Sequence, residues 1–140
     1  MNDWNTRIIE EFRGNAGKVG GNFAGAPVLL LTTTGARTGR HHITPVMYLP
    51  DGARFFVFAS KGGAPTNPDW YHNLVANPRA TIEVGVEEFE VNAEVVEGEE
   101  HDRLYAEQSK RYPQFAEYQA KTRRKIPVIA LTRLPGDEKS

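Results

Sequence analysis

The sequence of 140 residues contains no cysteine, which excludes disulfide bonds, thiolate metal ligands and cysteine nucleophiles. It has no apolar run close to the roughly 20 residues that a membrane-spanning helix needs. Its N-terminus lacks the basic and apolar segments of a signal peptide. A net charge of −1 disfavours a general nucleic-acid-binding protein or a polybasic membrane anchor. These absences predict a cytoplasmic protein, and the length predicts one domain over residues 1–140.

Several catalytic motifs are also missing. The four histidines form no HExxH or comparable spacing, so we expect no metal site. There is no GxSxG for a nucleophile elbow and no GxGxxG, and GARTGR does not meet the P-loop pattern. The carboxylates of residues 83–107 alternate along a predicted strand, which is typical of a solvated face. If a protein so short of reactive side chains is an enzyme, a cofactor should carry the difficult chemistry.

Charge is distributed unevenly along the chain. Residues 12–68 contain one acid, Asp51, among many cations, whereas residues 83–107 contain many carboxylates and one cation, Arg103. Positive charge returns in residues 110–125. A basic first half suits a ligand that carries phosphate or carboxylate groups.

Hydrophobic periodicity and turn signals predict a mainly β protein with peripheral helices. Apolar runs bounded by glycine, proline and asparagine predict about six strands, mostly antiparallel and joined by hairpins. A helix is expected over residues 3–12, followed by a glycine-rich loop to residue 25, and a polar tail covers residues 135–140. Asn67 is the expected N-cap of a short central helix, with Pro68 at its first position. Such strands bury their apolar faces best by closing into a small barrel.

The alternation of one predicted strand defines a row of apolar residues. These are Phe89, Val91, Ala93 and Val95, which we expect on one face of the sheet, with polar residues on the other.

The segment VLLLTTTGARTGRHHITPVMYL, residues 28–49, predicts two apolar strands around a polar turn. The turn offers hydroxyls, guanidinium groups and accessible backbone N–H groups, with no carboxylate among them. An anion is the natural ligand of such a turn, and an ordinary solvated turn is the alternative. Lys61, at a strand end beside two glycines, could reach the same anion or be a solvated lysine. Asn73 could face this site or be a surface asparagine.

Three aromatic residues, Tyr112, Phe115 and Tyr118, are spaced three apart in YPQFAEY. This spacing places their rings along one side of a helical turn. Core packing is one interpretation. A partly open site where a planar substrate stacks is the other, because two of the rings carry hydroxyls.

Three segments together resemble the deazaflavin-dependent nitroreductase family: LLLTTTGARTGRHHITPVMYL, FASKGGAPTNPDWYHNLVANP and YPQFAEYQAKTRRKIPVIAL. The resemblance extends over residues 20–131. It implies the split β-barrel of the flavin-reductase-like, FMN-binding-like proteins. The implied cofactor is coenzyme F-420, a deazaflavin whose tail carries a phosphodiester and polyglutamate. The implied reaction is hydride transfer from the reduced coenzyme to an electron-poor acceptor, such as a quinone, a conjugated enone or lactone, or a nitroaromatic.

The resemblance also implies roles for individual residues. The implied cofactor-binding residues are Ala36, Arg37, Thr38, His42, Ile43, Thr44, Pro45, Val46, Met47, Phe58, Ala59, Ser60, Lys61, Asp69, Trp70, Tyr71, His72 and Asn73. Among these, Arg37, Thr38 and Lys61 would grip the anionic tail, and Pro45, Val46 and Met47 would present backbone groups to the ring. Ser60, Tyr112 and Tyr118 would position or protonate the substrate, and Phe115 would line its pocket. Ala36 and His42 stand where a family member can carry arginine, and Phe115 replaces a tyrosine.

Other functions remain open at this point. An FMN-dependent split-barrel reductase differs in the length of the anionic tail, and the cations between Arg37 and Lys61 favour the longer polyanion. A non-catalytic carrier of the deazaflavin is a second alternative. A barrel that stacks single-stranded nucleic acid on Phe55, Phe56 and Phe58 is disfavoured by the net charge. The expected partner is a small-molecule hydride acceptor, with peripheral membrane contact if that acceptor is a lipid quinone. The expected state is a monomer or a homodimer.

Overall fold

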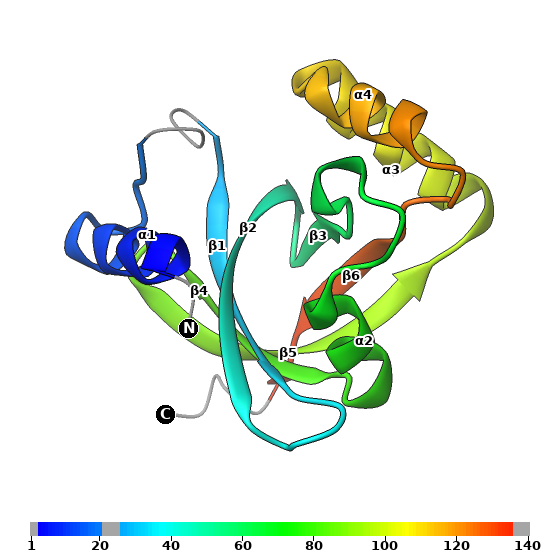
Figure 1. Cartoon of the computed structure of the whole chain (residues 1–140). Helices are drawn as coiled ribbons and strands as arrows, with labels where there is room; N and C mark the ends of the chain where they lie inside the picture. The colour runs from blue at the N-terminus through cyan, green and yellow to red at the C-terminus, as the bar shows by residue number, and fades with distance from the viewer. Residues whose placement is uncertain (1–2, 21–25, 136–140) are drawn as a thin grey trace.

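The computed structural model describes residues 3–20 and 26–135, and in this part of the chain six strands form a closed antiparallel barrel. The strand order around the barrel is β1-β2-β3-β6-β5-β4, and Figure 1 shows helices at its periphery. The strands are β1 (Val28–Thr34), β2 (His41–Asp51), β3 (Arg54–Phe58), β4 (Arg79–Val84), β5 (Glu87–Val96) and β6 (Val128–Arg133). The helices are α1 (Asp3–Gly14), α2 (Asp69–Ala76), α3 (Gly98–Arg111) and α4 (Gln114–Lys121), with a short 3-10 helix, η2 (Lys61–Gly63). The predicted fold class is confirmed.

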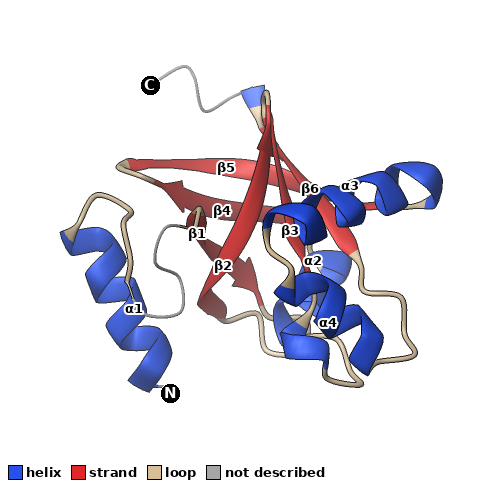
Figure 2. Cartoon of the chain, turned by 90° about the horizontal axis from the view of Figure 1, so that it is seen from above, coloured by secondary structure: helices blue, strands red, loops and turns tan. Residues whose placement is uncertain are grey.

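The interior of the barrel is filled by alternate residues of the strands. One cluster unites buried side chains from five strands with partly buried residues of β2, and two residues of α2, Trp70 and Leu74, join it. Because successive side chains of a strand point to opposite faces, the intervening residues pack outside the barrel. Phe56 and Phe58 of β3 lie under α3 and α4, and Leu30 of β1 packs with α1. Figure 2 shows these helices on different sides of the barrel. Both faces of β1 are therefore covered, as its continuous apolar run requires.

Strand β2 changes its pairing half-way along. Its first part pairs with β1, where Leu30 is opposite Pro45, and its pairing with β3 begins only at Tyr48. Within the described sheet, residues 41–47 thus have a neighbouring strand on one side only. A proline is tolerated in such a strand because one edge needs no ladder partner. Residues 41–44 of this part of β2 line the cavity that is described below.

Two details of the sequence prediction are wrong. Pro68, rather than Asn67, is the N-cap of α2, because the Asn67 side chain instead accepts a hydrogen bond from Arg124 at 2.6 Å. Val95 is not buried with the rest of its row, since 41% of it is exposed at the end of β5. Its neighbour Val96 packs against Leu104 of α3.

No described helix is long and apolar enough to cross a membrane. Residues 21–25 of the predicted glycine-rich loop and residues 136–140 of the predicted polar tail lie outside the described residues.

Candidate functional site

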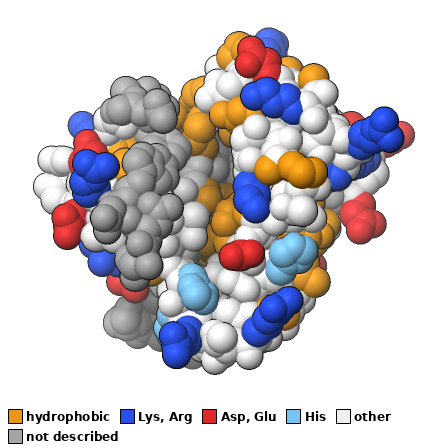
Figure 3. Space-filling view, in the orientation of Figure 1, with side chains coloured by type: hydrophobic (Ala, Val, Ile, Leu, Met, Phe, Trp, Pro, Cys, Tyr) orange, Lys and Arg blue, Asp and Glu red, His pale blue; other side chains and the backbone are white. Residues whose placement is uncertain are grey.

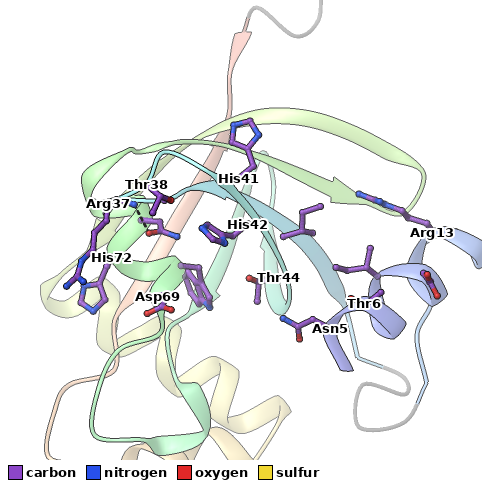
Figure 4. A pocket seen from close by; sticks show the side chains of 17 residues that line it. Asn5, Thr6, Arg13, Arg37, Thr38, His41, His42, Thr44, Asp69 and His72 are labelled. Atoms are coloured by element: carbon purple, nitrogen blue, oxygen red, sulfur yellow. Dashed lines mark hydrogen bonds between the residues drawn. The ribbon is translucent and has the colours of Figure 1, made fainter. Parts of the chain in front are cut away.

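A cavity of about 910 Å³ lies between the β1–β2 turn, α2 and α1. Figure 4 shows side chains of the turn and of α2 at one end of it and side chains of α1 at the other. Figure 3 shows a hollow on one face of the molecule, with hydrophobic side chains exposed along it and cationic and histidine side chains around its lower part. Predicted cofactor residues that line the cavity are Ala36, Arg37, Thr38, His42, Ile43, Thr44, Asp69, Trp70, His72 and Asn73.

The turn is held in shape by its own backbone. Gly35 donates to the carbonyl of Arg40 at 2.7 Å and accepts from the N–H of Gly39 at 3.0 Å. A Cβ added to Gly35 would lie 3.0 Å from Thr38 Oγ1 and 3.1 Å from His42 Nε2, so a larger residue would push these side chains apart. Residues 35–40 therefore form a compact rim to the cavity.

Helix α2 fixes this rim from behind through Asn73. Asn73 is 8% exposed; its Oδ1 accepts from the N–H of Ala36 at 3.0 Å, and its Nδ2 donates to Thr33 Oγ1 at 3.1 Å. One turn further along, Asn77 Nδ2 donates to the carbonyl of Thr34 at 3.3 Å. The buried side chain of Asn73 thus links α2 to the turn by hydrogen bonds, and the surface-asparagine interpretation is wrong.

The cations of the turn are available for a ligand. Arg37 and Arg40 are exposed, and neither forms an ion pair within residues 3–20 and 26–135. Carboxylates are also present, since Asp69 and Glu10 line the cavity at other points. Unpaired guanidinium groups with nearby hydroxyls suit an anionic group such as a phosphate.

Ser60 and Lys61 lie apart from this cavity lining. They follow β3, and Lys61 adopts a left-handed backbone conformation with a φ of 48° while its Nζ donates to Thr66 Oγ1 at 3.3 Å. The backbone of Gly63 approaches α4 so closely that an added Cβ would lie 2.8 Å from the carbonyl oxygen of Tyr118. This segment therefore packs against α4, the helix that carries Phe115 and Tyr118.

The three predicted aromatics do not share one environment. Phe115 is 5% exposed, and its ring packs edge-on against Phe58 and Tyr118. Its carbonyl accepts a hydrogen bond of 2.7 Å from the Tyr105 hydroxyl, whose pKa burial raises to about 12. Tyr112 and Tyr118 are only partly buried at the margin of this cluster. Core packing accounts for the Phe115 ring, and the two tyrosine hydroxyls stay candidates for substrate contact.

Only some of the predicted site residues line the large cavity, and the others lie elsewhere. Residues that do not line the large cavity are Pro45, Val46, Met47, Phe58, Ala59, Ser60, Lys61, Tyr71, Tyr112, Phe115 and Tyr118. Tyr71 lines a second cavity of about 380 Å³, together with His101 and Lys125. Ala59 is fully buried; its N–H donates to the carbonyl of Pro127 at 3.0 Å, and its own carbonyl accepts from Arg124 at 3.1 Å.

Sequence reasoning missed the wall that α1 contributes. Asn5, Thr6, Ile9, Glu10 and Arg13 line the cavity, as do Gly35 and His41. Arg13 holds the helix in place through two hydrogen bonds to the Glu83 carboxylate of β4, at 2.7 and 3.1 Å. Helix α1 showed only an apolar face in the sequence. Its polar face carries no motif, and its place beside the turn depends on tertiary packing.

Sequence reasoning also missed Arg124. Its guanidinium donates four hydrogen bonds to the segment between β3 and α2. In the sequence it is one of several basic residues near the C-terminus, and nothing distinguishes it from its neighbours.

A model of the family described as F420H(2)-dependent quinone reductase matches residues 4–133. The chain belongs to this family. An F420H(2)-dependent quinone reductase of Mycobacterium tuberculosis is 43% identical over 128 residues, which cover 87% of this chain and 85% of that protein. The resemblance to F-420-dependent reductases is confirmed, and with it coenzyme F-420 as the cofactor.

Solved structures agree with this assignment. A structure of an F420-H2 dependent reductase is similar with a TM-score of 0.69 and 39% identity, over 75% of this chain and 93% of that one. A domain-swapped dimer is similar with a TM-score of 0.71 and 35% identity, over 92% of this chain and 97% of that one. A haem storage protein from Vibrio cholerae shares the fold at 18% identity, with a TM-score of 0.61.

Proposed function

We propose that the 910 Å³ cavity binds coenzyme F-420 and that the protein reduces a quinone with it. The observation that carries the proposal is the Arg37 guanidinium, which has no ion-pair partner among the described residues and lies on the rim of a cavity that Trp70 also lines. The volume is within the range of about 300–1,000 Å³ that is usual for cofactor and ligand sites. The donor set of arginine, hydroxyl and histidine groups fits a coenzyme with a phosphodiester and carboxylates.

The turn would hold the anionic tail. Arg37 and Thr38 line one end of the cavity, and their side chains are exposed there. Lys61, on the segment after β3, would add a further positive charge. Because exposed charges are screened by salt, this part of the binding free energy should depend on ionic strength.

The open edge of β2 would hold the ring system. Residues 42–47 pair only with β1 within the described sheet, so backbone groups on their other side can bond a planar ligand. When bound and reduced, the coenzyme supplies a hydride. The contribution of the protein is then to hold donor and acceptor in contact and to exclude competing geometries.

The acceptor would be met by hydroxyl groups. Reduction of a quinone to a hydroquinone consumes one hydride and one proton, and negative charge develops on a quinone oxygen. Ser60, Tyr112 and Tyr118 are the side chains that we expect to donate hydrogen bonds to this oxygen, with the proton coming from one of them or from solvent. A quinone fits this arrangement because its oxygen atoms accept hydrogen bonds and its ring can pack on aromatics.

The enzyme's surroundings follow from the acceptor. A lipid quinone would bring the protein to a membrane surface, whereas a small quinone would leave it in the cytoplasm.

A homodimer is the state that we favour, since one similar solved structure is a domain-swapped dimer.

Two measurements test the proposal. The purified protein is titrated with coenzyme F-420 and with FMN while cofactor fluorescence is followed. Consumption of the reduced coenzyme is then measured with menadione, with 2-cyclohexenone and with a nitroaromatic. We expect binding of coenzyme F-420 but not FMN, and the fastest consumption with menadione. Binding without consumption by any acceptor would favour the carrier.

Arg37→Gln is the matched test of the cavity, with Arg7→Gln as its control. Arg7 is exposed on α1 but does not line the cavity. We expect coenzyme binding to weaken about tenfold in the first variant and to stay unchanged in the second, since a charge-assisted contact is worth roughly that factor. Equal affinities in both variants would exclude Arg37 from the site.

A further inference from the structure

The guanidinium group of Arg124 is bonded on several sides by the segment that joins β3 to α2. Its Nη1 donates to the carbonyl of Ala59 at 3.1 Å and its Nη2 to that of Ser60 at 2.8 Å. Its Nε donates to the carbonyl of Ala64 at 2.9 Å, and Nη1 also donates to Asn67 Oδ1 at 2.6 Å. One side chain thus fixes the segment both before and after η2.

Arg124 is itself held by α4. Gln119 Nε2 donates to the carbonyl of Arg124 at 2.7 Å, and Gln119 Oε1 accepts from the N–H of Ile126 at 3.0 Å. These bonds fix the backbone that directly follows the arginine. The guanidinium therefore projects from a rigid base, and the contacts run from α4 through Arg124 to the segment beyond β3.

Lys61, which lies within the segment that Arg124 holds, has a strained backbone. Lys61 has a φ of 48°, which is unusual for a residue with a side chain, and it lies between the carbonyls of Ser60 and Ala64 that Arg124 holds. A residue keeps such a conformation when its surroundings over-determine it, and strain of this kind gathers at ligand sites. Within residues 3–20 and 26–135, Arg124 forms no ion pair, so its donors serve the three carbonyls and the Asn67 side chain.

We propose that Arg124 is the positioning residue for Lys61 in the binding of the anionic coenzyme. It fixes the left-handed backbone of Lys61, so that the ammonium, which donates to Thr66 Oγ1 at 3.3 Å and does not line the large cavity, is held where it would meet a part of the coenzyme outside that cavity. Only an arginine can do this, because its planar fork reaches several carbonyls at once, whereas a lysine offers a single point charge. The inference rests on the proposed function, since it assumes that the chain binds coenzyme F-420.

The test compares Arg124→Lys with Arg123→Lys. The two changes are chemically identical, and Arg123 is exposed and makes no described contact with the segment. Dissociation constants for coenzyme F-420 are measured by fluorescence from low to high salt, in the wild type, in both variants and in Lys61→Ala. We expect Arg124→Lys to weaken binding about tenfold at low salt and to flatten its salt dependence as Lys61→Ala does. Arg123→Lys should behave as the wild type.

A double variant separates positioning from general destabilisation. If Arg124 acts through Lys61, Arg124→Lys should weaken binding less than about twofold in the Lys61→Ala background, because interacting residues are not additive. An equal loss in both backgrounds would overturn the inference, as would an unchanged affinity and salt dependence in Arg124→Lys. If circular dichroism shows that Arg124→Lys does not fold, Gln119→Ala replaces it. Its affinity and salt dependence, and its effect in the Lys61→Ala background, are then judged in the same way. Failure of the wild type to bind the coenzyme would instead refute the proposed function.

Discussion

Asn73 Oδ1 accepts a hydrogen bond from the backbone N–H of Ala36 at 3.0 Å, which joins α2 to the rim of the cavity across 37 residues of sequence. The other end of the same amide donates to Thr33 Oγ1, a group that is itself buried. A single amide group therefore satisfies one donor and one acceptor of the hairpin. The rim of the cavity depends on α2 for its position.

Asn73→Ala should damage both stability and binding. Removing the amide leaves the Ala36 N–H and the Thr33 hydroxyl without this partner, at a cost of about 1–3 kcal/mol in the free energy of unfolding. Denaturant unfolding measures this cost, and fluorescence titration measures the expected loss of coenzyme affinity. The control is Asn92→Ala on β5, a partly exposed asparagine away from the cavity. If Asn73→Ala has the free energy of unfolding of the wild type, the hydrogen bonds of Asn73 do not stabilise the fold.

The barrel could be predicted because each strand carries its own signals. The apolar run before Gly35 and the alternation from Phe89 to Ala93 are local patterns, and both segments form strands as expected. The alternation fails at Val95, where burial depends on the position of the strand end relative to α3. Local pattern predicts which residues form strands, and tertiary packing decides how deep the last of them lies.

The site could be predicted only in part, and for a similar reason. The turn around Arg37 is recognisable because its composition is unusual. Asn73 and Arg124 are not, since a single asparagine or arginine gives no signal until the fold brings its partners near, and those partners are mostly backbone groups. The wall formed by α1 was missed because sequence separation hides its contact with β4 through Arg13 and Glu83.

Lys61→Ala should weaken coenzyme binding more at low salt than at high salt. Lys61 is exposed, and its attraction for an anionic tail is screened as the Debye length falls from about 30 Å at 0.01 M to about 3 Å at 1 M salt. Fluorescence titrations at several salt concentrations measure this difference. Lys110→Ala on α3 is the control, since this lysine lies outside the site. An equal loss of affinity at every salt concentration would mean that Lys61 makes no charge contact.

Arg13→Ala should loosen the α1 wall of the cavity. The hydrogen bonds to Glu83 raise the pKa of Arg13, as expected for a bonded ion pair. Because half of the arginine side chain is exposed, the pair should contribute no more than about 1 kcal/mol to the free energy of unfolding. We expect faster hydrogen exchange in α1 at nearly constant global stability. Glu83→Gln should produce the same change, and the double variant should add little to it. Additive effects would show that the two residues act separately.

The ionisation of Tyr105 should lower the free energy of unfolding at high pH. Tyr105 as a whole is 8% exposed, and its hydroxyl donates to the carbonyl of Phe115. Burial raises its pKa from 10.0 to about 12, so the folded state favours the neutral phenol. This contribution is fully present below pH 10. It is lost as the pH rises towards 12, because the unfolded chain releases the proton first.

Urea unfolding at pH 8, 10 and 11 measures the effect, with Tyr105→Phe as the test. At pH 8 the variant should be about 1 kcal/mol less stable than the wild type because it lacks the hydrogen bond to Phe115. Since phenylalanine cannot ionise, the difference should shrink as the pH passes 10. The control, Tyr71→Phe, removes a hydroxyl for which the described residues provide no hydrogen bond, so its stability at pH 8 should match the wild type. A constant difference between wild type and Tyr105→Phe from pH 8 to 11 would mean that this phenol does not titrate differently in the folded and unfolded states.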